Sequence, residues 1–384
     1  MRVVYKISDN IITSLGCTTA ENMRSVYQAQ CGILPQNHTD FDIPEPFYAS
    51  RVSFENINKL PGNSSGYSGY TKFELMVIAS VIEAASETGI SLSSGDTLFI
   101  FSTTKGNVFL LEPDSPVGFN KERVNLWSSA NEICRFFNNT NTPVIISQAC
   151  ISGVTAILTG KMYLESGRYR NVVVTGGDMV SKFIVSGFQS FKALSPQPCK
   201  PFDSARDGLS LGEGAATLIL GIAEENELEK NSIIIKAGAT SNDANHISGP
   251  SRTGEGLYRA LIRTLNGSPT DDIAFINAHG TATPFNDEME AIAISRAGLL
   301  NIPVNSFKGY IGHTLGAAGL IETIISSHSL VDSRFVKCLG FSTIGVSEKL
   351  EIITGYDSFS GTECLKMASG FGGCNAVVHL KKLA

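Results

Sequence analysis

The chain has 384 residues, of which 42% are hydrophobic and 17% charged, so it has enough apolar sequence for a large core and does not resemble a disordered segment. Its net charge of −6, without a basic block, argues against a general nucleic-acid-binding protein. Its eight cysteines are scattered without a CxxC pair, which argues against a disulfide framework or a structural zinc site. The sequence contains no uncharged apolar run of membrane-spanning length and no signal-peptide core, so we expect a soluble, cytoplasmic protein.

In chain order, short β-rich runs alternate with helical stretches, which is the pattern of an α/β protein. The predicted strands are 3–8, 97–103, 144–148, 171–175, 216–221, 232–237, 273–278, 335–341 and 376–380. The predicted helices are 72–88, 151–165, 254–265, 287–297 and 319–331.

A charged stretch at 224–230 is the best candidate for a junction between two halves of the chain. The two sides share a plan, because the run 99–103 is similar to 275–279 and the strand, turn and helix around Cys150 are similar to the segment 304–327. This repetition predicts a duplicated α/β unit, with the chemistry placed where strand ends of the two halves meet.

The N-terminal half, residues 1–225, carries the most informative residue, Cys150. A buried strand followed at once by a helix places this thiol at a helix N-terminus, where the helix dipole favours thiolate over thiol. A free cysteine is also often a small buried hydrophobe, and position alone leaves both interpretations open.

The C-terminal half, residues 226–384, carries His279 and His313, each at a strand exit among glycines and small residues. A lone histidine in such a place is more often a hydrogen-bonded core residue, but two of them favour a functional site. Metal binding is the weaker functional interpretation, because the sequence has no HxH or HExxH pattern around them.

Several separate motifs, in order over residues 97–380, resemble the decarboxylating, two-histidine β-ketoacyl-acyl-carrier-protein synthases of the thiolase superfamily. The resemblance implies a thiolase-like fold of duplicated α/β halves in an α-β-α-β-α arrangement. The motifs are Ala-Cys-Ile-Ser-Gly (149–153), Lys-Pro-Phe-Asp (200–203), Arg-Asp-Gly (206–208), Gly-Glu-Gly-Ala (212–215), Asn-Ala-His-Gly-Thr-Ala-Thr-Pro (277–284) with Asp287 and Glu290, Lys-Gly-Tyr-Ile-Gly-His (308–313) and Gly-Phe-Gly-Gly (370–373).

By resemblance, Cys150 accepts an acyl chain as a thioester, and His279 and His313 stabilise the enolate oxygen formed when a malonyl thioester loses CO₂. One of the histidines also assists the thioester exchange. The backbone N–H groups of Cys150 and Phe371 are the implied oxyanion donors, and Phe371 is also an acyl-pocket gate. The implied activity is extension of a fatty-acyl or polyene chain by two carbons.

The remaining implied site residues support this chemistry. Lys308 and Glu322 support the histidine site through charge pairing and hydrogen bonds, with a structural salt bridge as the alternative for each. Thr281 and Thr283 match positions that bind the pantetheine arm, and Phe188 is a weaker acyl-pocket candidate. No metal and no cofactor beyond the phosphopantetheine of an acyl carrier protein are expected.

The expected partners are an acyl carrier protein and a second copy of the chain in a homodimer, with a heterodimer that contains a chain-length-factor-like relative as the alternative.

The stretch 186–195 is most similar to synthases of aryl-polyene-type pathways, against the broader alternative of primary fatty-acid synthesis. A non-elongating thiolase-type acyltransferase is the rival enzyme, but it is expected to place a cysteine before the glycine-rich loop, whereas Cys374 follows it. The strand 3–8 lacks the glycine-containing turn that is usual in the family.

Overall fold

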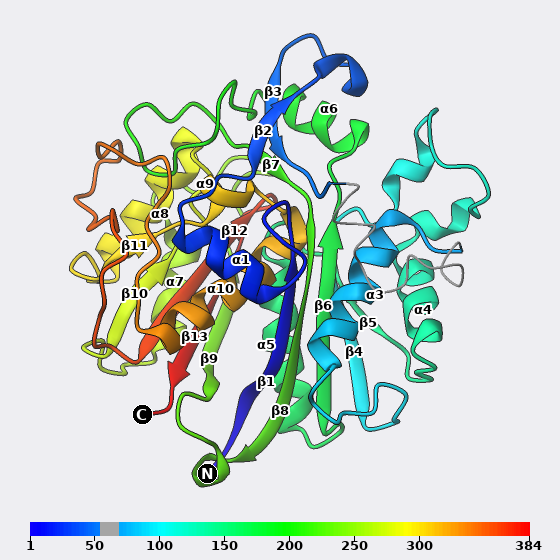
Figure 1. Ribbon diagram of the computed structural model, residues 1–384. Helices are drawn as coiled ribbons and strands as arrows, with labels where there is room; N and C mark the ends of the chain where they lie inside the picture. The colour runs from blue at the N-terminus through cyan, green and yellow to red at the C-terminus, as the bar shows by residue number, and fades with distance from the viewer. Residues whose placement is uncertain (54–68) are drawn as a thin grey trace.

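The computed structural model describes residues 1–53 and 69–384, and ten strands of this part of the chain form one mixed sheet (Figure 1). The strands from the first half are β1 (Arg2–Ile12), β4 (Thr97–Ser102), β5 (Val144–Ile146), β6 (Asn171–Asp178) and β8 (Gly214–Glu224). Those from the second half are β9 (Ile233–Asn242), β10 (Ile273–Asn277), β11 (Val304–Asn305), β12 (Glu363–Gly370) and β13 (Cys374–Lys382). A separate sheet contains β2 (Ile33–Gln36), β3 (Phe47–Ser50) and β7 (Leu211–Gly212).

The sheet topology repeats between the two halves. Strands run in the order β5-β4-β6-β8-β1 in the first half and β11-β10-β12-β13-β9 in the second, and the two halves are joined by pairing of β1 with β9 at Tyr5 and Ile234. The pairing directions also agree, since β4 and β10 are parallel to both of their neighbours, whereas β8 and β13 are antiparallel to theirs. The predicted duplicated α/β unit is therefore confirmed. The boundary placed at 225/226 falls between β8 and β9, and the independence of the two halves as domains stays a prediction.

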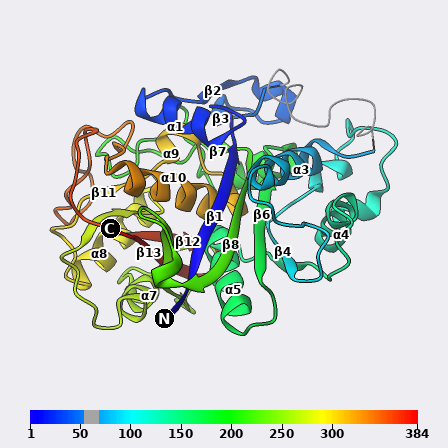
Figure 2. The same cartoon turned by 60° about the horizontal axis from the view of Figure 1, so that its bottom comes forward.

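The helices form three layers around the two halves of the sheet (Figure 2). The central pair is α5 (Ser152–Glu165) and α10 (Ala318–Asp332), the pair outside the first half is α3 (Lys72–Ala85) and α4 (Leu126–Phe136), and the pair outside the second half is α7 (Glu255–Leu265) and α8 (Pro284–Arg296). The strands between layers are buried on both faces, since Leu98 and Ile100 of β4 face the central layer while Phe99 and Phe101 face α3 and α4. This is the expected α-β-α-β-α arrangement.

Three further helices, α1 (Thr19–Tyr27), α6 (Lys182–Ser190) and α9 (Lys308–Ile311), complete the described α-helices. Among the described residues, the structure contains no helix both long and apolar enough to cross a membrane.

The predicted strand at 335–341 is wrong. Its alternation of buried and partly exposed side chains is real, but Phe335 and Cys338 donate backbone hydrogen bonds to Asp357 and Ile353 in an irregular segment, and the stretch joins neither sheet. Strand β12 was missed because Lys366 interrupts the apolar run that would have predicted it. Helices α1, α4 and α6 were also missed, since they carry many polar residues.

Helices α5 and α10 cross with their backbones in contact, and the contact depends on glycine. A Cβ atom on Gly153 of α5 would lie 2.3 Å from the backbone nitrogen of Leu320 in α10, so no side chain fits there without moving a helix. Gly319 faces the same crossing, because its Cβ would lie 2.8 Å from the backbone nitrogen of Val154. The crossing fixes the relative positions of the two halves.

Replacing Gly153 with Ala should therefore lower the free energy of unfolding by about 1–3 kcal/mol, the usual cost of overpacking, despite the higher helix propensity of alanine. Thermal unfolding followed by circular dichroism would measure the effect. Gly187→Ala in α6 is the matched control, because no heavy atom of the described residues lies within 4 Å of its Cβ position. Equal unfolding temperatures for both variants would contradict the assigned role of the crossing.

Candidate active site

Cys150 lies in the turn between β5 and α5, at the N-terminal end of α5. The preceding residue, Ala149, has φ of 45°, a left-handed conformation that turns the chain sharply from strand to helix. The hydroxyl of Ser152 closes this turn, because it donates to the Ala149 carbonyl at 2.6 Å and accepts from the Gln148 N–H at 2.8 Å. The thiol is thereby held in place two residues before the first residue of α5.

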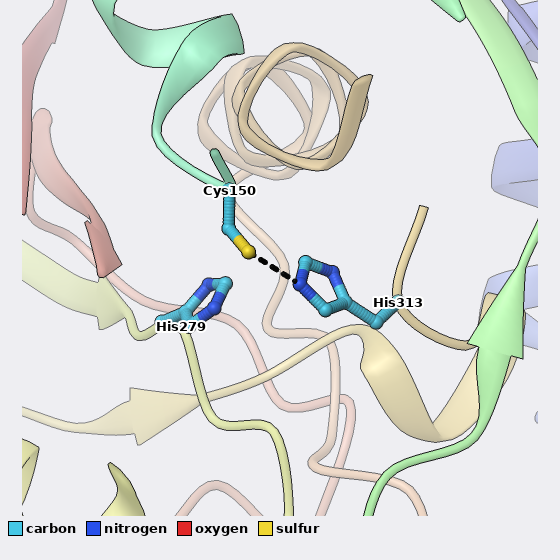
Figure 3. A group of neighbouring side chains, drawn as sticks. All are labelled: Cys150, His279 and His313. Atoms are coloured by element: carbon cyan, nitrogen blue, oxygen red, sulfur yellow. Dashed lines mark hydrogen bonds between the residues drawn. The ribbon is translucent and has the colours of Figure 1, made fainter. Parts of the chain in front are cut away.

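The two predicted histidines of the second half meet Cys150 at this point (Figure 3). His279 lies two residues after the end of β10, and His313 lies between α9 and α10. His313 Nε2 is 3.0 Å from Cys150 Sγ, and the two imidazole rings are nearly perpendicular with centroids 4.9 Å apart. All three side chains are buried. The structure therefore brings together the three residues that the sequence singled out from opposite halves.

A buried carboxylate on α8 anchors the loop that carries His279. Glu290 accepts the backbone N–H groups of His279 and Gly280, each at 2.6 Å, and Asp287 accepts that of Ala282 at 3.2 Å. Burial raises the pKa of Glu290 to about 7. These contacts give a structural reason for the carboxylates that follow the histidine motif.

Lys308 and Glu322 lie directly behind His279. Both are buried, and Lys308 Nζ is 2.6 Å from Glu322 Oε1, 2.6 Å from the His279 carbonyl oxygen and 3.2 Å from His279 Nδ1. An ammonium group has no acceptor, so His279 Nδ1 accepts this bond and the ring proton lies on Nε2. Lys308 thus fixes the tautomer of His279.

Both histidines are held in their uncharged form. Burial is the main cause that lowers the pKa of His279 well below its usual value, and its neighbours Lys308, His313 and Lys366 lower it further. Burial and the charges of Lys308 and Lys366 lower the pKa of His313 in the same way. At neutral pH, His279 is therefore a hydrogen-bond donor and His313 a base facing the thiol.

The helix terminus favours a thiolate at position 150, but burial of the side chain has the opposite and larger effect in the resting protein. Burial raises the pKa of Cys150 to about 12, and this effect exceeds the opposing effects of the Lys308 charge and the Phe371 backbone N–H. The sequence placed the thiol at a helix terminus correctly, but it gave no measure of its desolvation. The thiol is protonated at rest, and His313 Nε2 lies 3.0 Å from its sulfur.

The glycine-rich loop after β12 lies against the nucleophile. A Cβ atom on Gly370 would lie 2.9 Å from the Cys150 backbone nitrogen, so only glycine permits this approach. The Phe371 N–H hydrogen-bonds toward Cys150 and lowers the pKa of its thiol. The backbone amides of Cys150 and Phe371 therefore lie on the same side of the site, and their role as oxyanion donors stays a prediction.

A cavity of about 570 Å³ opens onto the Cys150 thiol. Thr281 and Thr283 line it, with their hydroxyl oxygens 2.8 Å apart, and so do Phe188 and Phe371, with ring centroids 5.8 Å apart. Phe191 joins this aromatic wall at 5.3 Å from the Phe371 ring, and it was not predicted. All of the predicted substrate-binding residues thus face one cavity.

Cys374 is a packed neighbour of this loop. Its sulfur is 3.3 Å from the Phe371 carbonyl oxygen and its side chain is buried. The negative form of Cys374 would raise the pKa of Cys150, so the two thiols do not activate each other.

Cys150, His279 and His313 are also the one group of three that could share a metal ion within the part of the chain that the structure describes, with all ligand atoms within 4.8 Å of one another. The ammonium of Lys308, next to His279, disfavours a cation there. The expectation that the site works without metal stays a prediction.

Two buried residues near the site were missed. Asp178, at the end of β6, accepts the backbone N–H groups of Thr104, Lys105 and Gly316, and so ties the first half to the loop after His313. Lys366 of β12 is fully buried, and its ammonium is 2.6 Å from Glu322. The sequence feature that could have revealed Lys366 is a single charged residue inside an otherwise apolar run.

The alkylation rate of Cys150 by iodoacetamide should rise about tenfold per pH unit between about pH 7 and about pH 10, because the thiolate fraction of a group with a pKa of about 12 keeps increasing over that range. Peptide mass spectrometry measures the modified fraction, and Cys150→Ser gives the background. A rate that levels off near neutral pH would instead mean that Cys150 and His313 already form a thiolate–imidazolium pair at rest.

Residues 83–226 match the family described as "Beta-ketoacyl synthase, N-terminal domain", and residues 232–342 match "Beta-ketoacyl synthase, C-terminal domain". The 3-oxoacyl-(acyl-carrier-protein) synthase 2 of Staphylococcus aureus strain COL is 32% identical over 249 residues, which are 61% of this chain and 60% of that protein. The enzyme of the same name from Rhizobium meliloti strain 1021 is 33% identical over 252 residues, 61% of this chain and 59% of that protein. The chain thus matches about 60% of the length of these curated relatives.

A chain from the complex of the ketosynthase ApeO with its chain length factor ApeC, from Xenorhabdus doucetiae, has a TM-score of 0.87 to this structure at 22% identity, covering 99% of this chain and 98% of that one. This likeness shows a shared fold. The two matched domains adjoin in the expected order, together cover more than half of the chain, and contain Cys150, His279 and His313. The chain belongs to the β-ketoacyl synthase family.

Proposed function

We propose that this protein is a β-ketoacyl-acyl-carrier-protein synthase, an acyltransferase that condenses malonyl-acyl-carrier-protein with an acyl group held on Cys150. The observation that carries the proposal is the convergence of a buried thiol, a base 3.0 Å from it and a second histidine with its Nε2 proton fixed. A hydrolase would need one base and a path for water, whereas a decarboxylative condensation needs two donors for an enolate oxygen.

In the first step, Cys150 Sγ attacks the thioester carbonyl of an acyl-pantetheine, and its proton passes to His313 Nε2. The oxyanion forms beside the backbone N–H groups of Cys150 and Phe371. Collapse of this intermediate breaks the bond to the pantetheine sulfur, which leaves with the proton from His313. The acyl group is now a thioester on Cys150, and both histidines are neutral again.

In the second step, the malonyl thioester oxygen accepts hydrogen bonds from His279 Nε2 and from His313 Nε2, once the ring proton of His313 has moved from Nδ1 to Nε2. The bond to the carboxylate breaks, CO₂ leaves, and the electron pair forms an enolate that the two donors stabilise. The enolate carbon attacks the acyl carbonyl on Cys150 and expels the thiolate, which is protonated by the one solvent proton that the overall reaction consumes. The low pKa values of both histidines suit this step, because a neutral imidazole donates without protonating the new carbanion.

Substrates would reach the thiol through the cavity as phosphopantetheine thioesters of an acyl carrier protein. Thr281 and Thr283 line this cavity, and in this proposal their hydroxyls hydrogen-bond the pantetheine amides. The names of the curated relatives specify acyl-carrier-protein substrates, which supports this partner. We place the reaction in the cytoplasm, where the buried free cysteines of this chain stay reduced.

The acyl chain would pass the aromatic wall of Phe188, Phe191 and Phe371. Flat aromatic surfaces suit a planar conjugated chain, which favours a polyene substrate over a saturated fatty acid. The likeness to a chain from a complex of a ketosynthase with its chain length factor adds a second candidate assembly. In that alternative this chain is the catalytic subunit of a heterodimer with a chain-length-factor-like relative, instead of a homodimer.

A non-elongating thiolase-type acyltransferase is the remaining alternative. A second catalytic cysteine is expected before the glycine-rich loop in such an enzyme, whereas Phe371 occupies the loop here and Cys374 packs behind it. A thiolase would transfer acyl groups between thiols without releasing CO₂, and this difference can be measured.

Incubation with acyl-carrier-protein thioesters should increase the mass of the Cys150 peptide by one acyl group, and the increase should be largest for a polyenoyl chain of the preferred length. Intact-protein and peptide mass spectrometry measure it. Cys150→Ser is the control for acylation at other thiols. Wild-type protein that never becomes acylated at Cys150 with any chain would refute the proposed function.

His279→Ala should reduce CO₂ release from malonyl-acyl-carrier-protein by about 10²-fold or more, as for the loss of one oxyanion donor, while the unfolding temperature stays near that of the wild type. His313→Ala should impair both CO₂ release and acylation of Cys150, because His313 Nε2 is 3.0 Å from the thiol sulfur. Radiolabelled malonyl substrate gives the CO₂ rate. Normal release from both variants would exclude the two histidines from the mechanism.

A further inference from the structure

Lys366 is a fully buried lysine that the mechanism above does not use. It lies in the middle of β12, between Asn277 of β10 and Val378 of β13, where a sheet strand normally carries an apolar side chain. Taking an ammonium out of water is strongly unfavourable unless acceptors surround it. The position therefore calls for a specific set of partners.

Three oxygen atoms surround the ammonium of Lys366. Glu322 Oε2 is 2.6 Å away, the carbonyl oxygen of Met367 is 2.6 Å away, and the carbonyl oxygen of Ala278 is 3.2 Å away. Ala278 directly precedes His279, so Lys366 binds the backbone of the histidine loop directly. It also holds the carboxylate that faces that loop.

Glu322 uses its two oxygen atoms on two different lysines. Oε1 binds Lys308 at 2.6 Å and Oε2 binds Lys366 at 2.6 Å. Lys308 in turn binds His279 at its carbonyl oxygen and its Nδ1 atom. A continuous buried chain of charged groups thus runs from Lys366 through Glu322 and Lys308 to the His279 ring. Without Lys366, Glu322 would lose one of the two contacts that set its orientation.

We propose that Lys366 is a positioning residue of the active site, which fixes His279 both through the Ala278 carbonyl and through the Glu322–Lys308 pair. This inference rests on the proposed function, in which His279 stabilises the enolate. Lys366 is not a catalytic residue, because it is not among the residues that line the cavity next to Cys150. Its effect reaches the chemistry only through the ring of His279.

The charge of Lys366 supports the role of His279 as its hydrogen bonds do, because it keeps the imidazole ring uncharged. The charged groups that face it are Glu322 on α10, Lys308 on α9 and Glu290 on α8. Its own positive charge lowers the pKa of both His279 and His313. Removing Lys366 should therefore make His279 easier to protonate as well as less firmly held.

Lys366→Met tests this proposal, because methionine fills a similar volume without charge. We expect CO₂ release from malonyl-acyl-carrier-protein to fall on the order of 10- to 100-fold, as for other residues that orient a functional histidine through hydrogen bonds. Acylation of Cys150 should change less than about threefold, since His313 contacts the thiol independently of Lys308. Lys236→Met is the matched control, because Lys236 is also ion-paired on a strand of the same half, with Glu363, but contacts no site residue.

A second measurement reads His279 directly and needs no substrate. Histidine-labelled protein is titrated by NMR, with the His279 signal assigned by its loss in His279→Asn. The pKa of His279 should rise in Lys366→Met and stay at the wild-type value in Lys236→Met.

The proposal is overturned if Lys366→Met releases CO₂ within about twofold of wild type, or if the pKa of His279 does not move. It is also overturned if CO₂ release and Cys150 acylation fall equally together with the unfolding temperature, since that pattern indicates a merely structural lysine. Wild-type protein that releases no CO₂ would instead refute the proposed function, and the NMR titration would still decide the role of Lys366.

Discussion

The close crossing of α5 and α10 is the constraint on which the rest of the site depends. Each half of the duplicated fold supplies one of these helices, and each helix follows a segment that carries a reactive side chain. Because Gly153 and Gly319 let the two backbones touch, Cys150 from one half and His313 from the other come within hydrogen-bonding distance. Neither half contains the site alone, so the chemistry is a property of the interface between them.

Electrostatics around this interface keeps every reactive group uncharged until substrate binds. The thiol is protonated and both histidines are neutral, while the charges lie one layer further back, on Lys308, Glu322 and Lys366. This arrangement differs from a cysteine hydrolase with a preformed ion pair. It suits a site in which a carbanion forms, since a charged imidazolium beside it would quench the carbanion by proton transfer.

Much of this could be predicted from the sequence. The alternation of strands and helices gave the α/β class, the ordered motifs gave the family, and the positions of Cys150, His279 and His313 at strand exits placed them in one site. The errors have physical causes. The pKa of Cys150 depends on desolvation by residues from both halves, which no local pattern reveals. Lys366 was overlooked because a lysine in a sequence normally indicates solvent, and its carboxylate partner lies 44 positions earlier, on α10.

The burial of the thiol has a consequence for the lifetime of the protein as well as for its chemistry. Peroxide and other oxidants attack thiolates, and they need access to the sulfur. Cys150 between turnovers is neither ionised nor exposed, since its side chain is 8% accessible and its pKa is about 12. An idle site of this kind is resistant to oxidation, because the burial that keeps the thiol protonated before substrate binds also slows its reaction with oxidants.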